Sequence, residues 1–249
     1  MKTSTFLSAE WRHLVMLNYV VAPDILKPLV PRGLELDYFQ NQTYLSVVGF
    51  RFLRTKVLGV PIPLHTDFEE VNLRFYVRRQ SREGWRRGVI FIRELVPRRA
   101  IAFIARAFYG EPYSALPMRH RLDLHAPNIR AEYAWQRSGK WESLYVSGTG
   151  EPQDIKIGSE EEFITEHYWG YSANRTGFNE YEVEHPRWRV WHSVECGLDA
   201  DIASLYGDRY VSALSVRPAS AFIADGSPII VRRKSPPLAE IDRPFPTAP

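Results

Sequence analysis

Runs of β-branched and aromatic residues recur along most of this chain, and they constrain its fold more than any other feature. Connections such as Ser81-Arg82-Glu83-Gly84 and Arg137-Ser138-Gly139-Lys140 have the length of hairpin turns, with a glycine available for a positive φ. The pattern predicts an extensive, mainly antiparallel sheet. The runs cover His13–Val21, Thr43–Lys56, Phe68–Arg79, Gly88–Leu95, Ile129–Arg137, Trp141–Ser147, Tyr181–Glu184 and Trp188–Val194.

Helix signals are few. Pro23–Leu29 is typical of a short helix that ends before Pro31. Pro97–Tyr109 has a proline in its first turn and Gly110 as its stop, which predicts a second helix. Ser159 followed three residues later by Glu162 is a capping box, which predicts that a third helix begins there. The expected fold class is therefore α+β, mainly β.

Length and composition are those of a globular protein. A chain of 249 residues with 45% hydrophobic content can bury a large core, and no linker divides it. We expect one domain over residues 1–249, with a proline-rich strap or tail over 235–249. The formal net charge is +3 with mixed signs and no Lys/Arg tract, which argues against a nucleic-acid partner. No stretch reaches the roughly 18 apolar residues of a membrane span, so we expect a cytoplasmic protein without a membrane partner. A homo-oligomer remains open.

Metal and disulfide chemistry find little support. Cys196 is the only cysteine, so neither an internal disulfide nor a multi-cysteine metal site can form. The nearest histidine sets, His65 with Asp67 and His120 with Asp123 and His125, lack the compact spacing of first-row metal motifs. We predict no metal and no cofactor.

One segment, residues 70–77, alternates strictly between polar and apolar side chains. In an ordinary half-buried sheet the polar face of such a strand meets water, whereas in a closed barrel it can line a polar cavity. The alternation alone fits both arrangements. Glu70, Asn72, Arg74 and Tyr76 share one face, and Val71, Leu73, Phe75 and Val77 share the other.

The order of several landmarks resembles that of acetoacetate decarboxylases over about residues 13 to 120. These landmarks are Val30-Pro31-Arg32-Gly33-Leu34-Glu35-Leu36, Phe68-Glu69-Glu70, the Glu83-Gly84-Trp85 turn, and Ala105-Arg106-Ala107-Phe108-Tyr109-Gly110-Glu111-Pro112-Tyr113-Ser114. The resemblance implies a cone-like antiparallel β-barrel with helices packed outside and a mostly apolar central cavity.

The whole chain more closely resembles the bacterial family called domain of unknown function 2071, also named YqjF-like, which brings no settled activity. The segments that carry this resemblance are Val30-Pro31 with Gly33-Leu34, Phe68 to Val77, His167-Tyr168-Trp169-Gly170-Tyr171, Val183-Glu184-His185-Pro186 with Trp188 and Trp191, and Phe222-Ile223-Ala224-Asp225-Gly226.

The resemblance to the decarboxylases carries over residue by residue. It implies that Glu70 stands where those enzymes keep a cavity glutamate and that Arg106 matches an arginine of theirs. Their Schiff-base lysine and the lysine after it correspond to Tyr113 and Ser114, and a substrate-facing arginine corresponds to Val20. Because the decarboxylase mechanism needs an amine that condenses with a ketone, a tyrosine at this position predicts that the chain is not a Schiff-base decarboxylase.

Three functions fit the sequence. The first is a non-covalent enzyme acting on a small organic carboxylate or planar substrate, with Glu70 and Tyr113 as the catalytic acid/base pair and Arg106 or Arg74 as a carboxylate anchor. The second is a ligand-binding or sensing protein without catalysis, which suits the missing lysine equally well. The third is a scaffold whose cavity is filled by side chains. The sequence leaves open whether the chain is an enzyme. The expected ligand-binding residues are Asn72, Arg74, Tyr76, Arg106, Ser114 and His120, around a small organic ligand in the central cavity.

Two aromatic segments, 167–171 and 188–191, are open to two interpretations. Large rings usually fill cores, and these segments fit that role. Alternatively, Tyr168, Tyr171 or Trp191 could form a lid over the cavity mouth and select a planar ligand. Glu184-His185-Pro186 could present an acid and a base to the same cavity, although a turn before the next strand explains the proline equally well.

Overall fold

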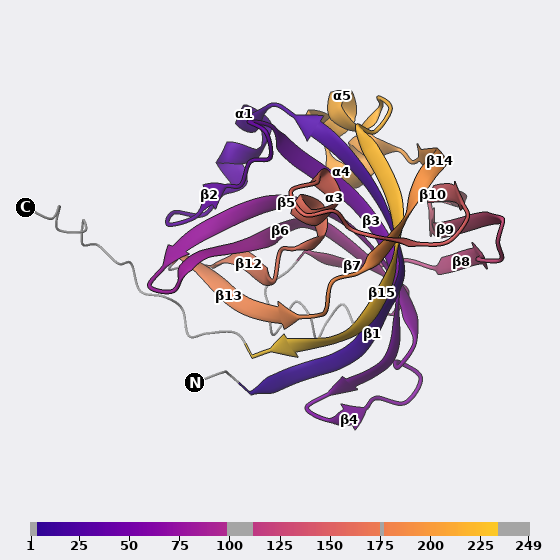
Figure 1. The fold of residues 1–249 in the computed structure, drawn as a ribbon, viewed down its shortest axis with the longest axis horizontal. Helices are drawn as coiled ribbons and strands as arrows, with labels where there is room; N and C mark the ends of the chain where they lie inside the picture. Colours follow the sequence, from indigo (N-terminus) through magenta and orange to yellow (C-terminus); the bar gives the residue numbers. More distant parts are fainter. Residues whose placement is uncertain (1–3, 99–111, 175–176, 234–249) are drawn as a thin grey trace, which may run out of the picture.

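The long strands of the chain curl into a closed, cone-like ring (Figure 1). The computed structural model describes residues 4–98, 112–174 and 177–233. Each ring strand pairs with the next, and pairing between the first and the last completes the closure, so the predicted cone-like barrel is confirmed. In spatial order the ring consists of β1 (Thr5–Val21), β3 (Thr43–Val57), β5 (Phe68–Ser81), β6 (Gly84–Val96), β12 (Trp169–Asn174), β13 (Gly177–Glu184) and β15 (Ser220–Arg232).

Two of the pairings differ from the antiparallel pattern expected. β6 pairs in parallel with β12 and also with the short β7 (Tyr113–Ala115). Parallel neighbours need a long crossover connection, and the chain travels from residue 96 to residue 169 between β6 and β12. The two predicted hairpin turns are confirmed, since β5 joins β6 at Ser81–Gly84 and β9 (Asn128–Arg137) joins β10 (Lys140–Thr149) at Arg137–Lys140.

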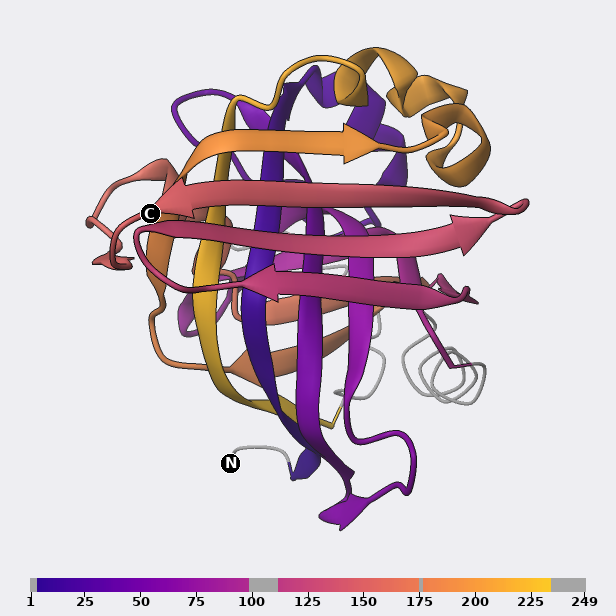
Figure 2. The same cartoon turned by 90° about the vertical axis from the view of Figure 1, so that its right-hand side faces the viewer.

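A second layer of strands continues from β15 and crosses outside β1, β3 and β5 (Figure 2). Its side chains pack closely on β3 at Gly49, where a Cβ would lie 2.9 Å from the aromatic ring of Tyr133. The layer consists of β14 (Arg189–Asp199), β10 (Lys140–Thr149), β9 (Asn128–Arg137) and β8 (Met118–Asp123). Short strands β2 (Glu35–Leu36), β4 (Val60–Pro61) and β11 (Gln153–Asp154) pair with β5, β3 and β14.

The wall of the ring separates two hydrophobic cores. The apolar face of β5 packs outward into a core shared with β9 and β10 of the second layer, so strands as well as helices cover it. The opposite face of the ring strands points into the cone, where Leu14, Phe50 and Phe222 form part of the inner core. The alternation of residues 70–77 therefore predicts their two faces correctly. The outward set is Val71, Leu73, Phe75 and Val77.

Helices occupy only short segments of the described chain. The first predicted helix is present as α1 (Pro23–Leu26) with a 3₁₀ turn η1 (Lys27–Leu29). The third is α3 (Glu160–Thr165), where Ser159 accepts a hydrogen bond from the Glu162 backbone N–H at 3.2 Å, as the capping box predicts. Three further turns, α4 (Ile202–Tyr206), η2 (Asp208–Tyr210) and α5 (Val211–Leu214), had no sequence signal that we recognised.

The predicted helix Pro97–Tyr109 and the tail 235–249 lie outside the described residues, apart from Pro97 and Arg98. Within the described ranges, no helix has the length and apolar character needed to cross a membrane.

Candidate functional site

A cavity of about 150 Å³ lies inside the ring. Packed side chains fill the ring toward α3, where the Tyr76 and Phe163 rings are 5.3 Å apart. Ile62 and His65, from the connection between β4 and β5, line the cavity, which places it toward the opposite end. Its volume is similar to that of an apolar cavity that accepts one benzene ring, a size of roughly 150 Å³.

Aromatic side chains form much of the cavity wall. Phe52 and Phe68 stack with centroids 4.6 Å apart, and the edge of Trp11 meets Phe52 at 5.9 Å. On another part of the wall His185 stacks on Trp188 with centroids 4.3 Å apart. Such surfaces bind apolar and planar groups well, because the rigid aromatic side chains lose little conformational entropy when a ligand contacts them.

A polar strip crosses this wall along β5. Glu70, Asn72 and Arg74 all line the cavity, as expected from their shared face. Asn72 Nδ2 donates to Glu70 Oε1 at 3.1 Å, and the Tyr113 hydroxyl donates to Glu70 Oε2 at 3.0 Å. Tyr113 reaches this position because β7 pairs with β6 and places Tyr113 beside Glu94, which in turn lies beside Asn72.

Glu70 is 3% exposed, and burial raises the pKa of its carboxyl from an ordinary 4.5 to about 7. The hydrogen bonds from Asn72 and Tyr113 and the positive charge of Arg74 act in the opposite direction, but burial dominates. Glu70 therefore populates both its neutral and its charged form near neutral pH. A group with this property can both accept and give a proton.

Arg74 is a buried cation, only 9% exposed. Its Nη2 donates to the Ile164 carbonyl at a long 3.4 Å, and its guanidinium lies 5.7 Å from the centre of the Tyr76 ring. Among the described residues, no carboxylate forms an ion pair with it. Its charge acts on Glu70 only at longer range, where it lowers the Glu70 pKa, so the guanidinium can still bind an anion in the cavity through direct hydrogen bonds.

Behind this strip, Asp37 orients a second ionisable group, His167. Asp37 Oδ2 lies 3.1 Å from His167 Nε2 and accepts a 2.6 Å hydrogen bond from Arg87 Nε. Burial lowers the pKa of His167 to about 4, so its imidazole is neutral at pH 7. Burial opposes ionisation of Asp37 as well, but His167 and Arg87 outweigh it and lower the Asp37 pKa.

An ionised Asp37 can only accept, so the His167 Nε2 carries the hydrogen and Nδ1 is the acceptor. That Nδ1 receives no hydrogen bond from a described residue, and His167 is one of the cavity residues.

The structure brings together only some of the predicted ligand residues. Tyr76 points into the ring but packs above the cavity, with its hydroxyl 2.7 Å from Ser46 Oγ. Ser114 accepts a hydrogen bond from Arg93 Nη1 at 3.2 Å and does not line the cavity. His120 lies on β8 of the second layer, with Nδ1 2.6 Å from Glu69 Oε1. Arg106 lies outside the described residues.

Glu94 and His167 line the cavity and were not among the predicted site residues, whereas His185 lines it as one interpretation of Glu184-His185-Pro186 allows. For Glu94 the cause is a β-bulge. The register of β5 with β6 changes between Leu73 and Arg74, where the extra residue on β6 is Ile92. A bulge reverses the alternation beyond it, so Val89 and Phe91 point inward and so does Glu94. Simple alternation places Glu94 on the outside.

The aromatic segments contribute side chains other than the expected ones. Trp169 and Trp188 line the cavity. Tyr171 belongs to the outer core, and Trp191 packs against that core while its Nε1 donates to the Gly150 carbonyl at 3.1 Å. Tyr168 packs beside His185 at 4.8 Å without lining the cavity. Of the two interpretations of these segments, packing is therefore the one that fits Tyr168, Tyr171 and Trp191.

Lysines are remote from the site within the described ranges. Lys27, Lys56, Lys140 and Lys156 are all exposed, whereas Lys2 and Lys234 lie outside those ranges. Val20, which matches the substrate-facing arginine of the decarboxylases, is 40% exposed and does not line the cavity.

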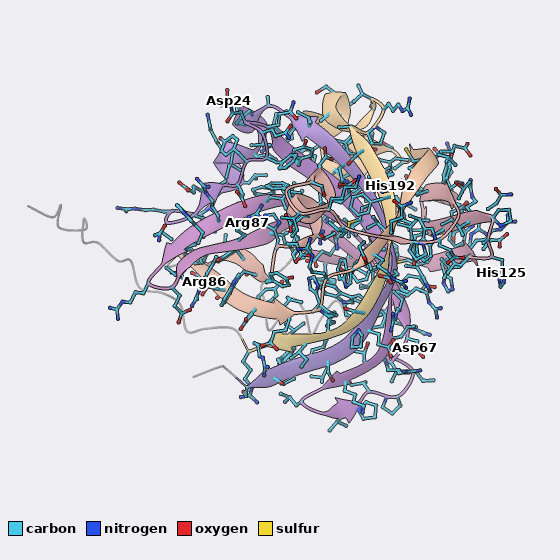
Figure 3. The ribbon with its side chains drawn as sticks, viewed as in Figure 1. Asp24, Asp67, Arg86, Arg87, His125 and His192 are labelled. Carbon is cyan, nitrogen blue, oxygen red and sulfur yellow. The ribbon has the colours of Figure 1, made fainter. Side chains whose placement is uncertain are left out.

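The histidine sets weighed for a metal lie away from the cavity or are incomplete. His125 stands at the far edge of the second layer, and Asp67 near the base of the ring (Figure 3). In the part of the chain that the structure describes, no group of three or more His, Cys, Asp or Glu side chains could hold a metal ion.

Residues 8–228 match the model of the family DUF2071, described as an uncharacterized conserved protein. The chain belongs to this family. A family relative, the uncharacterized protein YqjF of Bacillus subtilis strain 168, is 27% identical over 183 residues, which are 72% of each chain.

Solved structures place the family's fold among acetoacetate decarboxylase-like proteins. Acetoacetate decarboxylase from Legionella pneumophila aligns with a TM-score of 0.62 at 13% identity, over 92% of this chain and 86% of the other. The enduracididine biosynthesis enzyme MppR, complexed with pyruvate, aligns with a TM-score of 0.67 at 13% identity, over 94% and 91%. An acetoacetate decarboxylase-like enzyme from Sphingomonas wittichii RW1 aligns with a TM-score of 0.64 at 13% identity, over 92% of each chain. At these identities the likeness establishes the fold alone.

Proposed function

We propose that this protein binds a small organic molecule in the ring cavity and catalyses a non-covalent proton transfer on it, with Glu70 as the acid/base group. The observation that carries the proposal is the Glu70 carboxyl itself, which is buried on the cavity wall and has a pKa of about 7. A catalytic acid or base is most effective when its pKa lies near the working pH.

The neighbours of Glu70 have complementary roles in this proposal. Asn72 and Tyr113 each donate to one carboxyl oxygen, and together they fix the plane of the carboxyl group. The Tyr113 hydroxyl has one hydrogen, which it can redirect from Glu70 to a carbonyl oxygen of the substrate when Glu70 is protonated. Arg74 supplies positive charge that can hold a substrate anion next to the reacting group.

The structural relatives support a small-molecule ligand. The enzyme MppR has been seen with pyruvate and with the condensation product of pyruvate and imidazole 4-carboxaldehyde. The absence of a lysine among the described cavity residues favours a route without an imine in this chain.

Ligand binding without catalysis is the second candidate, and one observation favours it. Both oxygens of Glu70 already accept hydrogen bonds from the protein, which is the arrangement of a carboxyl with a structural role. In that case the aromatic wall supplies the affinity, and Glu70 adds only polarity to the cavity.

A metabolite screen followed by Glu70→Gln tests the proposal. Thermal stabilisation identifies ligands, and mass spectrometry then detects any product. We expect turnover of a stabilising ligand to fall by about 100-fold or more in Glu70→Gln, since this is the usual contribution of general acid/base catalysis.

Glu69→Gln is the matched control, because Glu69 is adjacent in sequence but does not line the cavity. Turnover that is unchanged in Glu70→Gln contradicts the proposed role. Stabilisation without any product, across the ligands found, supports binding alone.

A further inference from the structure

The cavity changes in character along the ring axis. Strand register places Phe68 beside Phe52, and Phe52 beside Trp11, so one level of the ring is aromatic on three neighbouring strands. Further along β5, the inward side chains are Glu70 and then Arg74. A ligand that fills the cavity therefore meets a polar end, which holds both carboxyl groups and the Arg74 guanidinium, and an apolar end.

Arg74 is the cation of the polar end and the group there that can hold an anion. Arg74 is 9% exposed, lines the cavity, and has no ion pair with a described carboxylate. Its Nε is fully buried and makes no hydrogen bond to a described residue, and its one printed hydrogen bond, from Nη2, is 3.4 Å long. A planar guanidinium matches a carboxylate, which it can hold through two parallel hydrogen bonds.

Other ionisable groups also face this space. Burial keeps His167 neutral at pH 7 by lowering its pKa to about 4, and burial also lowers the pKa of His185. Neither histidine therefore adds a positive charge at neutral pH. The ionisable cavity residues among those described are Glu70, Glu94, Arg74, Tyr113, Tyr181, His65, His167 and His185.

We propose that the cavity takes an organic monocarboxylic acid with an apolar chain or ring as its body, with the carboxylate on Arg74 and the body extending toward Trp11, Phe52 and Phe68. This assignment rests on the proposed function, since it names the class of molecule on which Glu70 acts. The cavity volume of about 150 Å³ suits a body that includes one ring.

Binding of such an acid is coupled to proton uptake at Glu70. The positive charge of Arg74 lowers the Glu70 pKa in the free protein. A carboxylate bound to Arg74 neutralises that charge and adds a negative charge nearby, and both effects disfavour ionised Glu70. The Glu70 pKa therefore rises above about 7 in the complex, and the protein takes up as much as one proton just above pH 7.

The binding test compares 4-phenylbutanoate with its uncharged amide, 4-phenylbutanamide, by isothermal titration calorimetry. The wild type should prefer the carboxylate. Arg74→Gln should weaken 4-phenylbutanoate binding by about 10-fold to 100-fold, as expected for the loss of a buried charged hydrogen bond, and change amide binding little. Arg74→Lys keeps the charge without the planar fork and should fall between the two.

Arg78→Gln is the matched control, since Arg78 lies on the same strand outside the cavity and pairs with Glu35 at 2.7 Å. Any of three results overturns the proposal: equal affinity for acid and amide, no effect of Arg74→Gln, or no binding of 4-phenylbutanoate to folded wild type.

The proton test repeats the 4-phenylbutanoate titration at pH 7.5 in buffers of different ionisation enthalpy. We expect proton uptake on binding to the wild type and none on binding to Glu70→Gln. The variant resembles the protonated form of Glu70, so it should bind the acid more tightly than wild type at pH 8 and about equally at pH 6. Glu94→Gln should retain the uptake, and its loss there instead overturns the assignment to Glu70.

These results are separable from the proposed function. Discrimination between acid and amide at Arg74 requires no turnover, so it survives if Glu70→Gln leaves turnover intact. Conversely, Glu70-dependent turnover survives if that discrimination is absent.

Discussion

Replacing Glu70 with glutamine should stabilise the protein at high pH and leave its stability nearly unchanged at low pH. Glutamine keeps the shape of the carboxyl group and can still accept the hydrogen bond from Asn72 or Tyr113, but it cannot ionise. In the wild type, burial makes the charged form of Glu70 unfavourable and raises its pKa to about 7.

The sign follows from proton binding in the two states. Between pH 4.5 and about 7 the native protein holds the Glu70 proton more tightly than the unfolded chain, so the free energy of unfolding falls as pH rises. The change from 4.5 to about 7 corresponds to roughly 3 kcal/mol, at about 1.4 kcal/mol for each tenfold change in the ionisation constant. This contribution is fully present below pH 4.5 and is lost above about pH 7.

The measurement is urea-induced unfolding of wild type and Glu70→Gln, followed by tryptophan fluorescence at several values between pH 5 and pH 8.5. We expect the difference in unfolding free energy to grow in favour of the variant by up to about 3 kcal/mol as pH rises.

Glu69→Gln is a control whose effect on stability should stay nearly constant between pH 5 and pH 8.5. The His120 hydrogen bond lowers the pKa of Glu69, whose ionised form is therefore stabilising above pH 4.5 and becomes less so as pH falls. A difference between wild type and Glu70→Gln that does not vary with pH would refute the buried, perturbed carboxyl and with it the basis of the proposed catalysis.

Two further perturbations probe the cavity and the closure of the ring. Wild type treated with acetoacetate and borohydride should gain no mass at a cavity residue. Tyr113→Lys in a Glu70→Gln background should instead be trapped as a reduced imine. Burial lowers the pKa of the new amine, and no carboxylate remains at position 70 to raise it. Intact-protein mass spectrometry reads this out, and a folded double variant that traps nothing places residue 113 outside the ligand space. Gly88→Ala should lower the free energy of unfolding, measured by chemical denaturation, by about 2–3 kcal/mol, since its Cβ would lie 2.4 Å from the Trp169 carbonyl oxygen across the parallel strand pair. Gly150→Ala, whose Cβ would meet open space, should lower it less despite a φ of +75°. Equal costs for the two substitutions contradict the tight closure at β6 and β12.

The strand pattern predicts the long antiparallel strands because each carries its own signal. Residues 70–77 show the simplest case, in which the apolar face enters the outer core and the polar face reaches the cavity. Local signals also locate the hairpin turns and the cap at Ser159. These features depend on neighbours within a few residues, so a sequence without homologues is sufficient to find them.

Features that depend on distant segments were not predictable in the same way. β15 runs from Ser220 to Arg232 and closes the ring, yet Gly226 and Pro228 interrupt its strand pattern. Gly226 has a φ of +79°, and a Cβ there would lie 2.0 Å from the Trp11 carbonyl oxygen, so a tertiary contact determines this residue. The bulge that turns Glu94 inward is also a property of the pairing between β5 and β6, with no mark in the sequence of β6 alone.

The exchange of a lysine for Tyr113, implied by the resemblance to the decarboxylases, changes what the same cavity can do. Burial disfavours charge of either sign, so an apolar wall lowers the pKa of an amine and raises that of a carboxyl. In a cavity with a lysine, this effect produces a neutral nucleophile for imine chemistry. In this chain the same effect acts on Glu70 and brings its pKa to about 7, while Tyr113 becomes its hydrogen-bond donor. The proposed function therefore needs no lysine, because desolvation by the ring wall acts on the ionisable group that is present.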